Sequence, residues 1–155
     1  MKYKCFLKNA ELLHEKFGII PLLYGSLGLE VLLKADLDAD DIDILIPGEF
    51  IAGERWGEFR LFLEASGYKM IDEHEHTFIR DSVEYSYAAI EGLKDFAGID
   101  ISVIPSRTDG GVQFMLLSLE QYLKVYLMSS LDGYRMNVKE KQDNQKIELI
   151  KKYMN

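Results

Sequence analysis

The fold class of this chain follows from residues 22–47, which read LLYGSLGLEVLLKADLDADDIDILIP. The apolar run at 19–24 predicts a buried strand, and Gly25 and Ser26 predict a tight turn at its end. Apolar residues at 27–33 predict a short helix that leans on a sheet. Residues 41–46, DIDILI, alternate at first and then become apolar throughout, which is typical of a half-buried strand.

The two acids of this second strand are expected to act together. Asp41 and Asp43 lie two residues apart, so they share one face of the strand. Carboxylates on one face repel each other, and a divalent cation is the usual way to offset that cost. Mg²⁺ suits them, because it is commonly held by one or two carboxylates and by substrate phosphates. The alternative is that the acids at 36–43 form a solvated loop running into an edge strand.

The turn before the helix predicts an anion site. Gly25 lets the backbone approach closely, Ser26 offers a hydroxyl, and the helix start offers unpaired N–H donors. A phosphate cradle facing a metal-binding pair of carboxylates indicates phosphoryl or nucleotidyl transfer.

These residues resemble the signature of the DNA polymerase beta-like nucleotidyltransferase superfamily. The signature has an apolar residue, Gly, then Gly or Ser, a gap, two acids one residue apart, and a third acid on a later strand. Gly25, Ser26, Asp41 and Asp43 match it, and the gap of 14 residues is similar to that of small antibiotic nucleotidyltransferases. The resemblance implies an α/β (α+β) fold: a small mixed sheet with packed helices and a helical C-terminal segment.

Two residues are candidates for the third acid, which would be the general base and a metal ligand. Glu84 lies between large apolar residues on a predicted strand at 83–90, and Asp100 does so on a predicted strand at 100–104. Order along the chain favours Glu84, although the superfamily usually carries Asp there. For each, the alternative is an ordinary outward-facing acid. Without a third acid, the protein would bind nucleotide without turning it over.

The C-terminal part offers cations for the phosphates. Lys124 lies among the aromatics of a helix that starts with a capping box at Ser118. Arg135 and Lys139, with Lys141 and Lys146, surround Asp143. If this part folds over the cleft, one of these cations would hold the triphosphate. The alternative for each is an ordinary solvated side chain.

The remaining elements follow from periodicity and turn residues. A turn-rich link at 108–111 divides a nucleotidyltransferase-like core, residues 1–107, from a helical segment, residues 108–155, within one compact domain. His74 and His76 flank Glu75 and suggest either a transition-metal site or a polar hairpin beside the acidic cleft. We expect helices at 3–17, 56–65 and 142–153, strands at 68–71 and 77–80, a short helix or turn at 92–98, and a helix break at 132–133.

Composition narrows the functional classes. The 155 residues carry a formal charge of −8, which disfavours non-specific nucleic-acid binding. Acids outnumber bases twenty to ten in the first 100 residues, which fits a metal on one side of a cleft. The single Cys5 suits a reducing cytoplasm, and no membrane span or signal peptide is expected.

The resemblance implies a reaction. A nucleoside monophosphate would move from a nucleoside triphosphate, with ATP favoured, to an acceptor hydroxyl on a small molecule or a protein. Two Mg²⁺ ions held by Asp41 and Asp43 would position the α-phosphate and neutralise the charge of the leaving group. One alternative is a non-catalytic protein that uses the fold for binding, as a partner in a toxin–antitoxin pair. Another is a drug-modifying enzyme that acts on an aminoglycoside or lincosamide.

Overall fold

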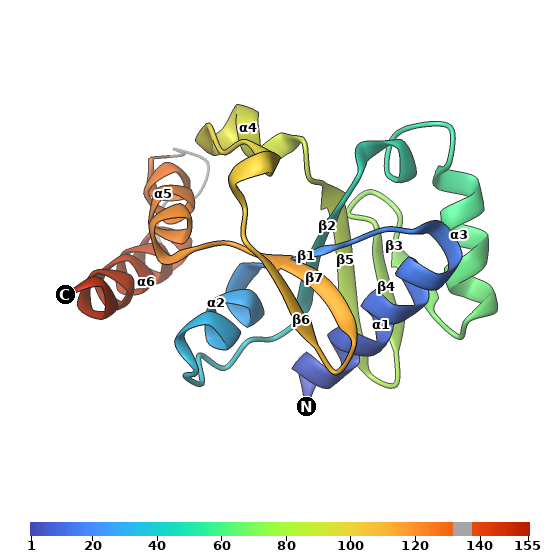
Figure 1. The fold of residues 1–155 in the computed structure, drawn as a ribbon, viewed down its shortest axis with the longest axis horizontal. Coiled ribbons are helices and arrows are strands. Elements are labelled where there is room, and N and C mark those ends of the chain that lie inside the picture. The colour runs from blue at the N-terminus through green and yellow to red at the C-terminus, as the bar shows by residue number, and fades with distance from the viewer. Residues whose placement is uncertain (132–137) are drawn as a thin grey trace.

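The computed structural model describes residues 1–131 and 138–155, with side chains described for 1–131 and 143–155. One seven-stranded mixed sheet has the order β3-β4-β5-β2-β1-β7-β6. In Figure 1, helices α2, α5 and α6 gather at one end of the molecule and α3 lies at the other. The predicted α/β class, a mixed sheet with packed helices, is confirmed. The predicted break at 132–133 lies outside the described residues. Among the described helices, none is long and apolar enough to cross a membrane.

The elements follow in this order: α1 (Lys2–Phe17), β1 (Leu22–Tyr24), α2 (Gly25–Leu33), β2 (Ile42–Ile46), η1 (Gly48–Phe50), α3 (Trp56–Ala65), β3 (Lys69–Asp72), β4 (Thr77–Arg80), β5 (Val83–Ala89), α4 (Gly92–Ala97), η2 (Ile101–Val103), β6 (Ser106–Asp109), β7 (Val112–Leu116), α5 (Leu119–Ser130) and α6 (Val138–Met154).

The centre of the sheet brings together segments that are distant in sequence. Strand β2 is antiparallel to β1 and parallel to β5, and β1 is parallel to β7. The register places Tyr24 opposite Asp43, Asp43 opposite Ser86, and Ser86 opposite Thr77. Cross-strand partners share a face of the sheet. A row of polar side chains therefore crosses four strands on one face.

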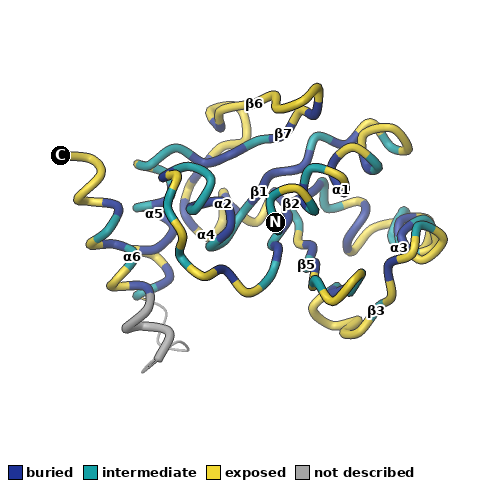
Figure 2. Tube along the Cα trace, turned by 90° about the horizontal axis from the view of Figure 1, so that it is seen from below, coloured by how far each residue is buried: buried dark blue, intermediate teal, exposed yellow. Residues whose placement is uncertain are grey.

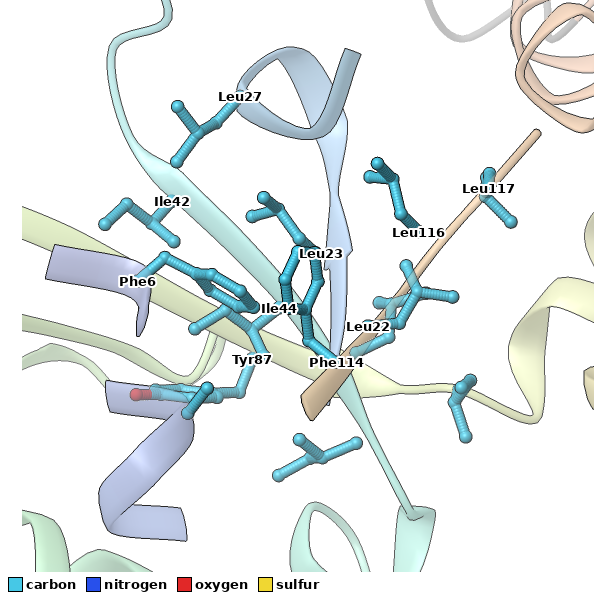
Figure 3. Packing of buried hydrophobic residues seen from close by; sticks show 14 of the residues in the cluster. Phe6, Leu22, Leu23, Leu27, Ile42, Ile44, Tyr87, Phe114, Leu116 and Leu117 are labelled. Carbon is cyan, nitrogen blue, oxygen red and sulfur yellow. The ribbon is translucent and has the colours of Figure 1, made fainter. Parts of the chain in front are cut away.

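The core lies against the central strands, as Figure 3 shows. Leu23 of β1 and Ile42 and Ile44 of β2 are fully buried, as the alternation predicted. Phe6 of α1 packs edge-to-face on Phe114 of β7, with ring centroids 5.3 Å apart. Exposed residues gather at the two edge strands, β3 and β6 (Figure 2). Because the central strands are buried on the core side, their register cannot slip by one residue without moving the whole apolar set to the opposite face.

Most predicted elements occur close to their expected positions, and two do not. The predicted strand at 100–104 is wrong: Asp100 Oδ1 accepts hydrogen bonds from the backbone N–H and the hydroxyl of Ser102, at 2.9 Å and 2.7 Å. This local capping favours the short helix η2 over an extended strand. The expected link into a helical tail at 108–111 is also wrong, since Gly110 and Gly111 form the turn between β6 and β7. The sheet therefore extends to Leu116, and α5 starts at the predicted capping box, in which Gln121 N–H donates to Ser118 Oγ.

Candidate active site

A cavity of about 560 Å³ opens beside the central strands, and five predicted site residues line it. Gly25 and Ser26 begin α2, Asp41 and Asp43 lie at the start of β2, and Glu84 lies on β5. The turn and the acid pair are brought together because β1 and β2 pair antiparallel, so the end of β1 lies beside the start of β2.

The backbone at Gly25 closes tightly on Asp43. Gly25 has a φ of +64°, in the left-handed region that glycine adopts without steric cost. A β-carbon at position 25 would overlap Asp43 Oδ2 and lie 3.1 Å from Asp43 Cγ. The start of α2 therefore contacts the acid, and Gly25 and Ser26 of its first turn line the same cavity.

Glu84 lies on the same face of the sheet as the acid pair. The register pairs Ile42 with Tyr85, so continuing it by one residue places Glu84 beside Asp41. The position beside Asp43 is held by Ser86, whose hydroxyl lies 2.8 Å from that of Thr77. Within the described residues, no group of three His, Cys, Asp or Glu side chains is gathered to hold a metal ion. Asp41 and Asp43 therefore stand as a pair of carboxylates on this face, with Glu84 one strand away.

Several residues that were predicted to belong to the site do not line the cavity or lie outside the described residues. Asp100 caps η2 and pairs with Lys94 at 3.9 Å, and it does not line the cavity. Lys124 Nζ lies beside Gly98, also away from the cavity lining. Arg135 is outside the described residues, and Lys139 lies on α6 with its side chain outside the described part.

One tail cation does reach the turn. Lys146 of α6 donates from Nζ to Ser26 Oγ at 2.9 Å, and its Nζ lies 5.3 Å from the centre of the Tyr126 ring. Helix α6 therefore brings a positive charge to the hydroxyl and N–H groups at the start of α2. A phosphate placed there would meet three kinds of donor.

Two tyrosines of α5 support the turn, and the sequence did not reveal that role. The Tyr122 hydroxyl donates to the Gly25 carbonyl oxygen at 3.0 Å, and the Tyr126 ring packs against Lys146, whose Nζ donates to Ser26 Oγ. Burial raises the pKa of both hydroxyls well above the usual value, and nearby charge, including that of Asp43, adds to this effect. Their spacing of four residues was the available signal, but it indicates only a helical apolar stripe.

The histidines belong to a hairpin turn between β3 and β4. His74 is almost fully exposed, and His76 packs edge-on against Trp56 with ring centroids 4.7 Å apart. The polar-hairpin interpretation describes this turn, in which Glu75 lines the cavity.

Comparisons with known proteins show the family and the fold of the chain. No protein-family model matches the chain. YnaI of Bacillus subtilis (strain 168), described as an uncharacterized protein, is 41% identical over 150 residues, which cover 97% of this chain and 96% of YnaI. The chain belongs to the YnaI family. At this identity, we expect YnaI and the present chain to share one fold.

Solved structures identify the fold. A nucleotidyltransferase-like antigenic protein from Paracoccidioides brasiliensis aligns with a TM-score of 0.64 at 17% identity, covering 93% of this chain and 72% of that protein. The solution structure of the antibiotic-resistance factor ANT(2'')-Ia aligns with a TM-score of 0.58 at 15% identity, covering 99% and 85% of the two chains. A crystal structure of ANT(2'')-Ia with adenylyl-2''-tobramycin aligns with a TM-score of 0.54 at 14% identity, covering 99% and 97%. This member of the YnaI family therefore has the nucleotidyltransferase fold, which confirms the resemblance.

Proposed function

We propose that the chain is a Mg²⁺-dependent nucleotidyltransferase that moves a nucleoside monophosphate from a nucleoside triphosphate, with ATP favoured, to an acceptor hydroxyl. One observation carries this proposal. The Gly25–Ser26 turn, the Asp41 and Asp43 pair and Lys146 all line one cavity, although Lys146 comes from the far end of the chain.

The phosphates bind at the start of α2. The Ser26 hydroxyl and the N–H groups of the first helical turn donate to the distal phosphates, and the helix dipole favours their negative charge. Lys146 Nζ already lies 2.9 Å from Ser26 Oγ, so it adds charge to the same contacts. The pyrophosphate leaving group is held by these donors.

Asp41 and Asp43 fit a magnesium site by the chemistry of their donors, since both carboxylates line the cavity on one strand face. They would hold two Mg²⁺ ions, which supply positive charge to the triphosphate. Glu84 accepts the proton from the acceptor hydroxyl, because it lies on the same face and its carboxylate is exposed to the cavity. Because Gly25 has no side chain, the Asp43 carboxylate has room to lie against the start of α2.

A second candidate function is nucleotide binding without transfer, as a partner protein of the toxin–antitoxin kind. The observation that favours it is the hydroxyl of Ser86, rather than a carboxylate, beside Asp43. Such a protein would bind Mg-nucleotide at the same turn and lack the proton acceptor.

The acceptor hydroxyl belongs to a small molecule or a protein. Acidic side chains dominate the charged lining of the cavity, where Glu75 and Asp143 join the predicted acids and Lys146 is the one cation among the described lining residues. This charge suits a cationic acceptor. One fold neighbour is seen with adenylyl-2''-tobramycin, so an aminoglycoside and a lincosamide are included as candidate acceptors.

Calorimetric titration with Mg-ATP tests the binding step. We compare the wild type with an Asp41→Asn/Asp43→Asn double variant and with a matched Asp81→Asn/Asp95→Asn variant, whose residues are exposed and outside the cavity lining. We expect the first variant to lose at least tenfold in affinity and the second to bind like the wild type. Equal affinity in all three proteins would reject the metal-site part of the proposal.

A labelled-nucleotide assay tests the transfer step. The protein is incubated with α-phosphate-labelled triphosphates, Mg²⁺ and either tobramycin, a lincosamide or cell extract. Transfer by the wild type, with loss of transfer and retained binding in Glu84→Gln, supports the enzyme. Tight binding with no transfer to any acceptor favours the binding protein instead.

A further inference from the structure

One part of the cavity is used by neither the phosphate contacts nor the acid pair. It is formed by Phe96 of α4, Val125 and Ser129 of α5, and Asp143 of α6. Asp143 is 5% exposed, whereas Phe96 is 37% exposed. This part therefore combines a buried carboxylate with an open aromatic face.

Its position follows from the packing of α5 on α6. Two successive contacts join α5 to α6, and each contact is called a layer here. Tyr126 lies against Lys146 in one layer, and Ser129 donates to Asp143 at 2.7 Å in the next. Each step is three residues along a helix, or about 4.5 Å. The Ser129–Asp143 layer thus lies next to the layer that contacts the phosphate turn, on the same cavity.

The buried carboxylate of Asp143 is held by α5. Among the described residues, Ser129 is the side chain that hydrogen-bonds Asp143, through Oδ2. Burying a charge is costly, and a neutral amide at position 143 would join α5 to α6 with less desolvation. A ligand N–H that reaches the other carboxylate oxygen would lower this cost.

The aromatic side chain supplies the second contact. Phe96 projects from the short helix α4 at the cavity lining and keeps over a third of its surface exposed. Aromatic faces that remain open beside a polar site bind planar bases by stacking. Val125, which is buried, provides an apolar surface nearby.

We propose that these four residues form the nucleobase subsite, and that Asp143 selects bases with an exocyclic amino group. This inference rests on the proposed function, because it assumes that the cavity holds a nucleotide. Adenine, cytosine and guanine can donate an amino N–H to the carboxylate. Uracil presents carbonyl oxygens on both sides of its single ring N–H, and these repel a carboxylate.

Binding of four Mg-nucleotides and of inorganic tripolyphosphate tests the subsite. For the wild type, we expect ATP, CTP and GTP to bind at least about tenfold more tightly than UTP, as one charge-assisted hydrogen bond allows. Asp143→Asn should remove or reverse this preference, because the amide can donate to a uracil carbonyl. Phe96→Ala should weaken all four nucleotides by about fivefold or more through lost stacking. Neither variant should change tripolyphosphate binding.

The controls separate the subsite from the rest of the proposal. Tyr153→Ala removes an exposed aromatic of α6 outside the cavity lining and should change no affinity. If Asp143→Asn does not fold, the wild-type base preference and Phe96→Ala decide the question, because Phe96 is partly exposed. Equal binding of all four nucleotides, unchanged by Phe96→Ala, would overturn the subsite and leave the proposed function standing. Failure of every nucleotide to bind the wild type would overturn both.

Discussion

Gly25 leaves no room for a side chain beside Asp43. A β-carbon at position 25 would overlap the Asp43 carboxylate, and Gly25 also holds a φ of +64°. The two residues come from different elements, α2 and β2, which the antiparallel pairing of β1 with β2 brings together. The relationship couples the shape of the phosphate turn to the position of one acid.

Replacing Gly25 by Ala should therefore damage both stability and nucleotide binding. The left-handed backbone alone costs about 1–2 kcal/mol for a residue with a β-carbon. The clash with Asp43 adds about 1–3 kcal/mol. Gly18→Ala is the matched control, since Gly18 has a φ of +70° with nothing within 4 Å of an added β-carbon. Urea unfolding and Mg-ATP titration measure the two effects, and equal losses of stability in both variants would disprove the clash.

Lys146→Met should weaken phosphate binding and leave the fold intact. Methionine keeps most of the apolar stem while removing the charge that meets Ser26 Oγ. We expect tripolyphosphate affinity to fall by about tenfold at low salt, because a charge-assisted contact is lost. Lys151→Met, on the exposed side of the same helix, serves as the control. Unchanged affinity in Lys146→Met would remove this lysine from the phosphate site.

A buried polar pair fixes α1 on the sheet. Asn9 Nδ2 donates to the Tyr87 hydroxyl at 2.7 Å, and within the described residues Asn9 Oδ1 is buried without a hydrogen-bond partner. Tyr87→Phe alone should cost about 1–3 kcal/mol, because it leaves the amide unsatisfied. The double variant Asn9→Leu/Tyr87→Phe should regain most of this stability. Urea unfolding decides the matter, and additive losses would contradict the expectation.

Alkaline pH should unfold the protein through its buried tyrosines. Burial raises the pKa of Tyr122 and Tyr87 well above the usual value, so the folded state keeps protons that the unfolded chain loses near pH 10. Stability should be constant below about pH 10 and fall above it, by up to about 1.4 kcal/mol per pH unit for each tyrosine. Tyr122→Phe should flatten this fall, and Tyr153→Phe, which is exposed, should not. Urea unfolding between pH 8 and pH 11 gives the slopes, and parallel curves for all three proteins would refute the assignment.

Residues 22–47 were enough to predict the turn, the short helix and the acid pair. Each of these signals is local: a strand alternates with period two, and a glycine-serine turn precedes a helix. The capping box at Ser118 was predicted for the same reason, because its partners are three residues apart. The β6–β7 hairpin was missed, since its two glycines were interpreted as a link between segments. The role of Glu84 stays a prediction that the nucleotide assays test.

Long-range packing decided the rest of the site. Lys146 meets Ser26 across 120 residues of sequence, and no local pattern separates it from the other lysines of the tail. Tyr122 reaches the Gly25 carbonyl across 97 residues, whereas its spacing to Tyr126 shows only an apolar helix face. Periodicity reveals which side of an element is buried but not which element covers it. That choice depends on how α5 and α6 pack against the end of the sheet.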